Sequence, residues 1–207
     1  MSLAQGRWKY RHDSVLKVIC HHLSLFLIQV KRKSNDNLVF VPAGASDGIR
    51  GRAKARAGLL RSAVDWILLD DLGRRLVFPA HIAQTSQRPD IVLYSSSSQT
   101  LVMVELTCPC EENFDLQHMK KLDRYDKLKD DCELNGWKVF LFAVEVGARG
   151  YVAHSLTSCL KRFGLVGKNL RLAVKEAGDE ALRTSFWLWL LREEPEWKSI
   201  GFHQQKR

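Results

Sequence analysis

Two short apolar runs joined by a cluster of serines constrain this chain most strongly. Residues 91–94 and 101–106 are rich in β-branched, aromatic and aliphatic side chains, which favour strands. The serine-rich residues 95–99 predict a turn, so we expect the two runs to form a β-hairpin. Asp90 stands at the entry of the first strand and Glu105 near the end of the second. In an antiparallel pair these two positions are neighbours, so both carboxylates are expected at one edge of a sheet.

Such a pair of carboxylates needs a compensating partner, because an acidic side chain is unfavourable in an apolar strand. A divalent metal ion is one such partner, since Mg²⁺ prefers oxygen ligands. The alternative for Asp90 is a turn that follows Pro89, and the alternative for Glu105 is a salt bridge to a neighbouring lysine. The hairpin therefore predicts either a metal site or two separately compensated acids.

The same residues resemble the core motif of the PD-(D/E)XK nuclease superfamily. The motif is present as Pro89-Asp90, fourteen intervening residues, and then Glu105-Leu106-Thr107. The triplet at residues 11–13 (Arg-His-Asp), which opens an apolar helix, is similar to the restriction-like endonuclease domain of non-LTR retrotransposons. It is similar also to related domains that follow reverse transcriptases in many animal elements. The resemblance covers about residues 8–150.

This resemblance implies a DNA endonuclease that depends on Mg²⁺ or Mn²⁺. The implied metal ligands are Asp90, Glu105 and the backbone carbonyl of Leu106. It also implies DNA as the partner, with either a reverse transcriptase region or a separate domain that supplies specificity. The expected location is inside the cell, in the nucleus.

The motif departs from the family pattern at its last position, where Thr107 stands in place of lysine. Some branches of the superfamily move this lysine to the following helix, and Lys120 and Lys121 are the candidates here. On a helical wheel of residues 115–133, Lys121 falls at the edge of an apolar band and Lys120 falls outside it. We therefore predict Lys121 as the catalytic lysine; the band consists of Leu116, Met119, Leu122, Tyr125 and Leu128. The departure also leaves open a nucleic-acid-binding module of the same fold without catalysis.

A second tier of candidates surrounds these residues. His12 and Asp13 either lie near the site, as the resemblance implies, or are a solvated histidine and a helix cap. Glu145 ends the next predicted strand and is a candidate for the outer part of the site. Thr107 and Tyr125 are further second-tier candidates. Residues 111–113 either bind a second metal or start the helix. Three histidines lack partners at zinc spacing and are expected on the surface: His118, His154 and His203.

The positive charge is concentrated in the first third of the chain. Residues 1–64 contain twelve Lys and Arg against three Asp and Glu, whereas residues 65–207 contain twenty of each. Such a basic segment suits phosphate binding, although it does not distinguish DNA from RNA or an anionic membrane. The alternatives are a helix-dipole role for residues 31–33 and a disordered connection at residues 42–58. The predicted nucleic-acid contacts are Arg11, Lys31, Arg32, Lys33, Arg50, Arg52, Lys54 and Arg56.

The order of predicted elements indicates an α/β or α+β fold. The resemblance narrows it to an α/β restriction-endonuclease-like domain, a mixed β-sheet core flanked by helices, over residues 7–164. The basic loop 42–58 is inserted in it, and a helical C-terminal extension, residues 165–207, packs on it. Helices are expected at 11–30, 115–133, 155–163, 170–177 and 179–194, and further strands at 38–41, 66–69, 76–78 and 137–146.

Other classes are disfavoured by composition. Five cysteines without a paired framework indicate reduced thiols in an intracellular protein. The apolar run 15–30 is short for a membrane span and contains His21 and His22, so no membrane partner is expected. Aromatic residues between 186 and 190 are expected to pack in the core, although a third hypothesis makes that helix the binding surface of an interaction domain.

Overall fold

The computed structural model describes residues 7–35 and 58–193, except for the side chains of residues 33–35. The strand predicted at 38–41 therefore lies outside the described residues, as do Arg50, Arg52, Lys54 and Arg56 of the predicted basic loop.

Four strands form one mixed sheet in the order β1-β2-β3-β4. β2 (Ile91–Ser95) pairs antiparallel with both β1 (Ile67–Asp70) and β3 (Thr100–Thr107), and β4 (Lys138–Glu145) runs parallel to β3. Ile91 is paired with Val104 and Ser95 with Thr100, which confirms the predicted hairpin. The strand predicted at 76–78 is wrong, because that segment is an irregular connection between β1 and β2.

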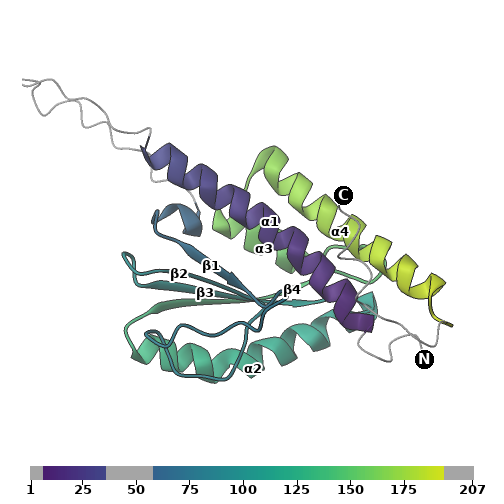
Figure 1. Ribbon diagram of the computed structural model, residues 1–207, viewed down its shortest axis with the longest axis horizontal. Coiled ribbons are helices and arrows are strands. Elements are labelled where there is room, and N and C mark those ends of the chain that lie inside the picture. The colour runs from purple at the N-terminus through teal and green to yellow at the C-terminus, as the bar shows by residue number, and fades with distance from the viewer. Residues whose placement is uncertain (1–6, 36–57, 194–207) are drawn as a thin grey trace, which may run out of the picture.

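Helices cover both faces of this sheet (Figure 1). The long helices α1 (Arg7–Asn35) and α4 (Gly167–Leu190) lie with the shorter α3 (His154–Phe163) on one face, and α2 (Phe114–Leu134) lies on the other. Alternation along β3 explains this division, because successive side chains of a strand point to opposite faces. Val102, Val104 and Leu106 join the core with α1, whereas Leu101 and Met103 pack with α2. The predicted α/β class with a mixed, helix-flanked sheet is thus confirmed.

The helix α4 is continuous, so the break predicted at Gly178 is wrong. A Cβ atom at Gly178 would lie 2.5 Å from the carbonyl oxygen of Gly150, so the glycine permits a close approach of two backbone segments. Small residues on the same helix, Ala173, Ala177 and Ala181, are buried in the core that α1 and the sheet share. The middle of α4 therefore belongs to the main hydrophobic core.

The aromatic end of α4 is exposed, contrary to the expectation of core packing. Phe186 and Trp189 each expose 56% of their surface, and their rings stack with centroids 6.3 Å apart. This end of α4 lies beside the first turn of α1, where Arg7 Nη1 donates to the carbonyl of Leu191 over 2.9 Å. The sheet therefore does not cover these aromatic rings.

One helix among the described residues, Arg7–Arg32 within α1, is long and apolar enough to cross a membrane by length and composition alone. Half of that stretch is buried inside the molecule, where it packs on the sheet and on α4.

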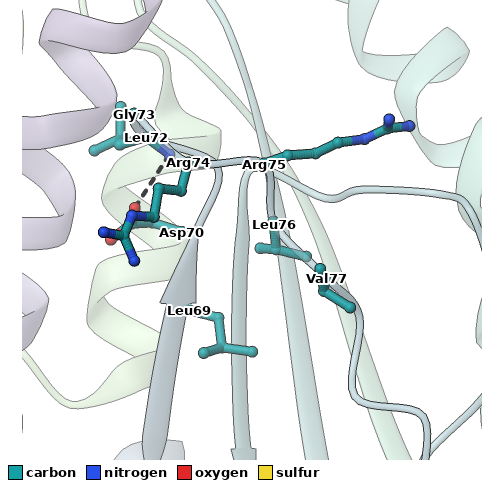
Figure 2. A pocket seen from close by; sticks show the side chains of 8 residues that line it. All are labelled: Leu69, Asp70, Leu72, Gly73, Arg74, Arg75, Leu76 and Val77. Atoms are coloured by element: carbon teal, nitrogen blue, oxygen red, sulfur yellow. Dashed lines mark hydrogen bonds between the residues drawn. The ribbon is translucent and has the colours of Figure 1, made fainter.

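The connection that follows β1 forms a pocket of about 600 Å³ beside the sheet. Asp71 shapes this connection: its Oδ1 accepts a hydrogen bond from the Leu76 backbone N–H over 2.7 Å. Arg74 and Arg75 extend from its rim in different directions (Figure 2). The Asp71 backbone N–H donates to the carbonyl oxygen of Asp90 over 3.1 Å, which ties this connection to the start of β2. The pocket lies beside the predicted carboxylate pair, since neither Asp90 nor Glu105 lines it.

Candidate active site

The two carboxylates of the hairpin meet at the end of the sheet where β1, β3 and β4 finish and β2 begins. The backbone N–H of Asp90 donates to Glu105 Oε2 over 3.2 Å, and the N–H of Leu106 donates to Asp90 Oδ2 over 2.7 Å. Asp90 and Glu105 are exposed by only 9% and 3%. The hairpin register therefore brings both acids to one buried point, as the sequence predicts.

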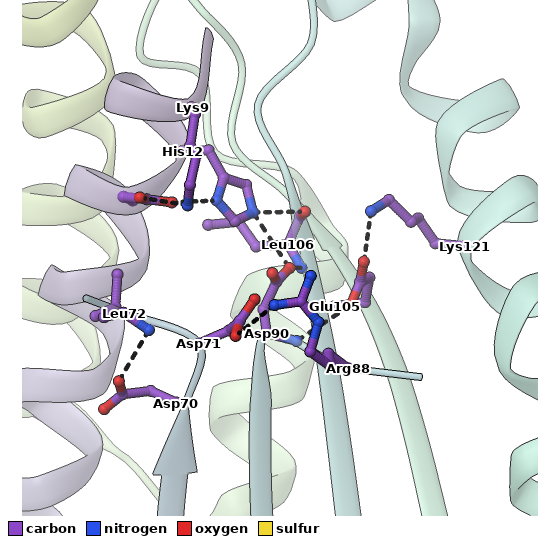
Figure 3. Close-up of polar contacts among 11 residues, drawn as sticks. Lys9, His12, Asp70, Asp71, Leu72, Arg88, Asp90, Glu105, Leu106 and Lys121 are labelled. Carbon is purple, nitrogen blue, oxygen red and sulfur yellow. Dashed lines mark hydrogen bonds and ion pairs between the residues drawn. The ribbon is translucent and has the colours of Figure 1, made fainter. Parts of the chain in front are cut away.

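Lys121 reaches this point from α2 on the opposite side of the hairpin from α1 (Figure 3). Its Nζ donates to Glu105 Oε1 over 2.5 Å, whereas Lys120 is exposed to solvent. Of the two candidate lysines, the structure brings Lys121 to the carboxylates.

The apolar band predicted for α2 is buried only in its second half. Leu116 and Met119 are 54% and 57% exposed, and α2 buries Tyr125, Leu128 and Cys132 instead. The physical reason is that the first turns of α2 lie over the charged ends of β3 and β4 and not over the apolar centre of the sheet.

Tyr125 supports the site from the same helix as Lys121. Its ring is fully buried, and its hydroxyl donates to the carbonyl oxygen of Arg88 over 2.8 Å. Burial and the nearby charge of Glu105 raise the pKa of Tyr125, so the phenol stays protonated. It therefore fixes the chain that leads into Asp90 and does not exchange protons near neutral pH.

His12 enters the site from α1 on the opposite side from Lys121 (Figure 3). Its Nε2 lies 3.2 Å from Asp90 Oδ2 and 3.2 Å from the carbonyl oxygen of Leu106, and its Nδ1 lies 3.1 Å from Asp13 Oδ1. Burial lowers the pKa of His12, but the hydrogen bonds and charges of Asp13 and Asp90 outweigh burial and raise it to about 9. Because α1 begins at Arg7, Asp13 is an interior helix residue and not its cap.

The two buried carboxylates repel each other, and Lys121 and His12 offset part of this charge. Burial and the charge of Asp90 raise the pKa of Glu105, and Lys121 opposes that rise. A cation between the two acids would relieve this repulsion, and the donors are two carboxylates, an imidazole and a backbone carbonyl. Across residues 7–35 and 58–193 no three His, Cys, Asp or Glu side chains form a ready metal cluster. The residues therefore fit Mg²⁺ or Mn²⁺, which take oxygen ligands and water.

A second polar group extends the site along α2. Glu145 is buried at the end of β4, with its Oε1 3.0 Å from His118 Nδ1 and its Oε2 accepting from Ser155 Oγ over 2.5 Å. His118 is partly exposed, near the surface as expected, but it also has a buried partner, which the sequence did not predict. His118 precedes Lys121 by one helical turn, so both side chains lie on the same side of α2. Thr107 is paired with Glu145 in the sheet, and its buried Oγ1 has no hydrogen-bond partner within the described part of the chain.

Comparison with known proteins assigns no family. No protein-family model matches the sequence, and no curated protein matches it.

The predicted nucleic-acid contacts are spread widely. Arg11 donates to the carbonyl oxygen of Cys108 over 2.6 Å and to Ser185 Oγ over 3.2 Å, so its guanidinium joins the end of β3 to α4. Lys31 and Arg32 are exposed near the far end of α1, and of Lys33 only the backbone is described. Lys31 lies nineteen positions after His12, which is about 28 Å along a helix.

Sequence reasoning missed several polar residues near the carboxylates. Arg74 and Arg75 are exposed at the adjacent pocket, and Arg88 Nη1 lies 3.4 Å from Asp71 Oδ1. No local motif marks these residues, because their place depends on how the connection after β1 folds back over the start of β2.

Proposed function

We propose that this chain is a metal-dependent nuclease that hydrolyses DNA phosphodiester bonds, of the PD-(D/E)XK type. The observation that carries the proposal is the meeting of Asp90, Glu105 and Lys121 at one buried end of the sheet, with Lys121 Nζ 2.5 Å from Glu105. The hairpin supplies both acids, and the following helix supplies the amine that Thr107 lacks. This combination of two acids and one amine suits hydrolysis of a phosphodiester.

Asp90, Glu105 and the Leu106 carbonyl would hold Mg²⁺ or Mn²⁺. When bound, the cation supplies Lewis-acid polarisation of the phosphate and a more acidic water. Lys121 favours the ionised form of Glu105 through their direct contact and is placed to orient the attacking water. Tyr125 holds the backbone before Asp90, so the two carboxylates keep their spacing.

A DNA duplex lying across the molecule would reach several basic residues. The distance of about 28 Å between His12 and Lys31 corresponds to about eight base pairs of B-form DNA. One duplex can therefore contact Lys31 and Arg32 at one end and the carboxylates at the other, with Arg74 and Arg75 near the cleavage point. In this proposal the protein acts in the nucleus, and a reverse transcriptase region or another domain supplies target specificity.

A second candidate function is DNA binding without cleavage. It is favoured by Thr107 at the position where the motif has lysine. The contact between Lys121 and Glu105 favours the nuclease instead, because it restores an amine at the carboxylates.

Nicking of supercoiled plasmid in Mg²⁺ tests the proposal, with Asp90→Ala as the matched control. We expect the wild-type protein to nick the plasmid and the variant to bind DNA without nicking it. If neither protein nicks DNA in Mg²⁺ or Mn²⁺ while both bind it with a salt-dependent affinity, the binding module is correct and the nuclease is not.

A further inference from the structure

Both ring nitrogens of His12 face oxygen atoms that accept hydrogen bonds. Asp13 Oδ1 lies 3.1 Å from Nδ1, and Asp90 Oδ2 and the Leu106 carbonyl oxygen each lie 3.2 Å from Nε2. All three atoms are hydrogen-bond acceptors, and a neutral imidazole has only one N–H to offer. With that N–H given to Asp13, the Nε2 lone pair faces two oxygens, so a second proton or a metal ion must lie between them.

The spacing of these donors fits a shared metal ion. Mg²⁺ binds its ligands at about 2.1 Å in octahedral geometry, so neighbouring ligand atoms are about 3.0 Å apart. The two distances of 3.2 Å from His12 Nε2 are close to this edge length. The distances from His12 Nε2 to Asp90 Oδ2 and to Leu106 O are therefore compatible with ligands of one cation.

Asp13 and the buried helix hold the ring in this orientation. Metal-binding histidines commonly donate their other N–H to a carboxylate, which fixes the tautomer and the ring plane. Asp13 has this position, and it is itself anchored by Lys9 Nζ at 2.7 Å. The next residues of α1, Val15 and Leu16, are fully buried, so the helix supporting His12 is part of the rigid core.

We propose that His12 is a nitrogen ligand of the cation, through Nε2, and that Asp13 is the residue that positions it. The proposal rests on the metal site of the proposed function and adds a ligand of a different kind. An imidazole suits transition metals better than Mg²⁺, whose preferred donors are oxygens. The site therefore binds Mn²⁺ more tightly than Mg²⁺, and His12 is the residue that creates the preference.

Pulsed electron paramagnetic resonance of the Mn²⁺-loaded wild-type protein, without DNA, tests this ligand directly. We expect the ¹⁴N coupling of a coordinated imidazole in the wild type and its loss in His12→Ala. Calorimetric titration with Mn²⁺ should show affinity reduced at least 10-fold in His12→Ala and roughly 10-fold in Asp13→Asn, which keeps the coupling. His21→Ala is the matched control, because His21 is an exposed histidine of the same helix, and it should change neither readout.

The outcomes separate this inference from the proposed function. Mn²⁺ binding that requires Asp90 but shows no ¹⁴N coupling in the wild type would overturn the role of His12 and leave the nuclease proposal standing. Absence of Mn²⁺ binding in the wild type would overturn both. The wild-type spectrum decides the question even if His12→Ala fails to fold, since it needs no variant.

Discussion

At the scale of residues, the proposed function depends on single side chains at the carboxylate pair, and on Lys121 above all. We predict that Lys121→Ala lowers the single-turnover cleavage rate by about 100-fold or more, because a positioned acid–base group contributes roughly that much. Lys120→Ala is the matched control and should cleave at nearly the wild-type rate, since Lys120 is exposed and Lys121 contacts Glu105. Quenched-flow cleavage at saturating enzyme measures both rates. A slow Lys120→Ala with a normal Lys121→Ala would reverse the assignment.

At the scale of elements, the hairpin turn that aligns the two acids is held by a residue outside it. Asp65 accepts hydrogen bonds from Ser95 Oγ and Ser97 Oγ, both at 2.6 Å, and from the Ser97 N–H at 2.8 Å. Burial raises the pKa of Asp65, but these hydrogen bonds lower it well below its usual range. A lowered pKa means that the stabilisation is present above about pH 4, the unfolded value, and is lost as the pH falls through the folded value.

We therefore predict that Asp65→Asn lowers the free energy of unfolding by roughly 1–2 kcal/mol at pH 7, the range of hydrogen bonds to charged groups at a partly exposed site. The difference from the wild type should shrink as the pH falls below about 4, because the unfolded chain then binds a proton at this carboxyl that the folded protein takes up only at lower pH. Urea unfolding at several pH values measures it. A difference that stays constant from about pH 7 to about pH 2 would contradict this role for the ionised carboxylate.

The continuity of α4 gives a second prediction at this scale. Gly178→Ala should destabilise the protein by about 1–3 kcal/mol, because its Cβ would lie 2.5 Å from Gly150 O and 3.2 Å from Val152 Cγ2. Arg171→Ala, an exposed position of the same helix, should shift stability by at most about 0.5 kcal/mol. Thermal unfolding followed by circular dichroism compares the two. A stabilised Gly178→Ala would show that the backbone contact with Gly150 is not maintained in solution.

At the scale of the whole molecule, the proposed function makes the distribution of basic residues testable. We predict that Arg74→Ala/Arg75→Ala weakens DNA binding and reduces the slope of log affinity against log salt by roughly two, because each phosphate that is no longer neutralised lowers it by about 0.9. Lys161→Ala/Arg162→Ala removes the same charge from an exposed pair at the end of α3 and should leave the slope unchanged. Fluorescence anisotropy at several salt concentrations measures both. Equal weakening in the two double variants would indicate net charge as the cause and not a binding surface at the pocket.

Local patterns in the sequence were enough to predict the hairpin and, with it, the meeting of Asp90 and Glu105. Strand alternation and the serine turn act over a few residues, and the two acids are only 15 positions apart. The strands at the centre of the sheet, the mixed α/β class and the helix that carries Lys121 follow from the same short-range periodicity.

Long-range packing decided the rest. His12 reaches Asp90 across 78 positions because α1 packs on the face of the sheet opposite α2, and no local pattern sets the rotation of that helix about its axis. Long-range packing also brings His118 to Glu145 and leaves Leu116 and Met119 exposed. It likewise keeps α4 helical through Gly178, which lies against the backbone of Gly150. Periodicity shows that a helix has a buried side, but the neighbouring elements decide which charged residues that side meets and where its burial ends.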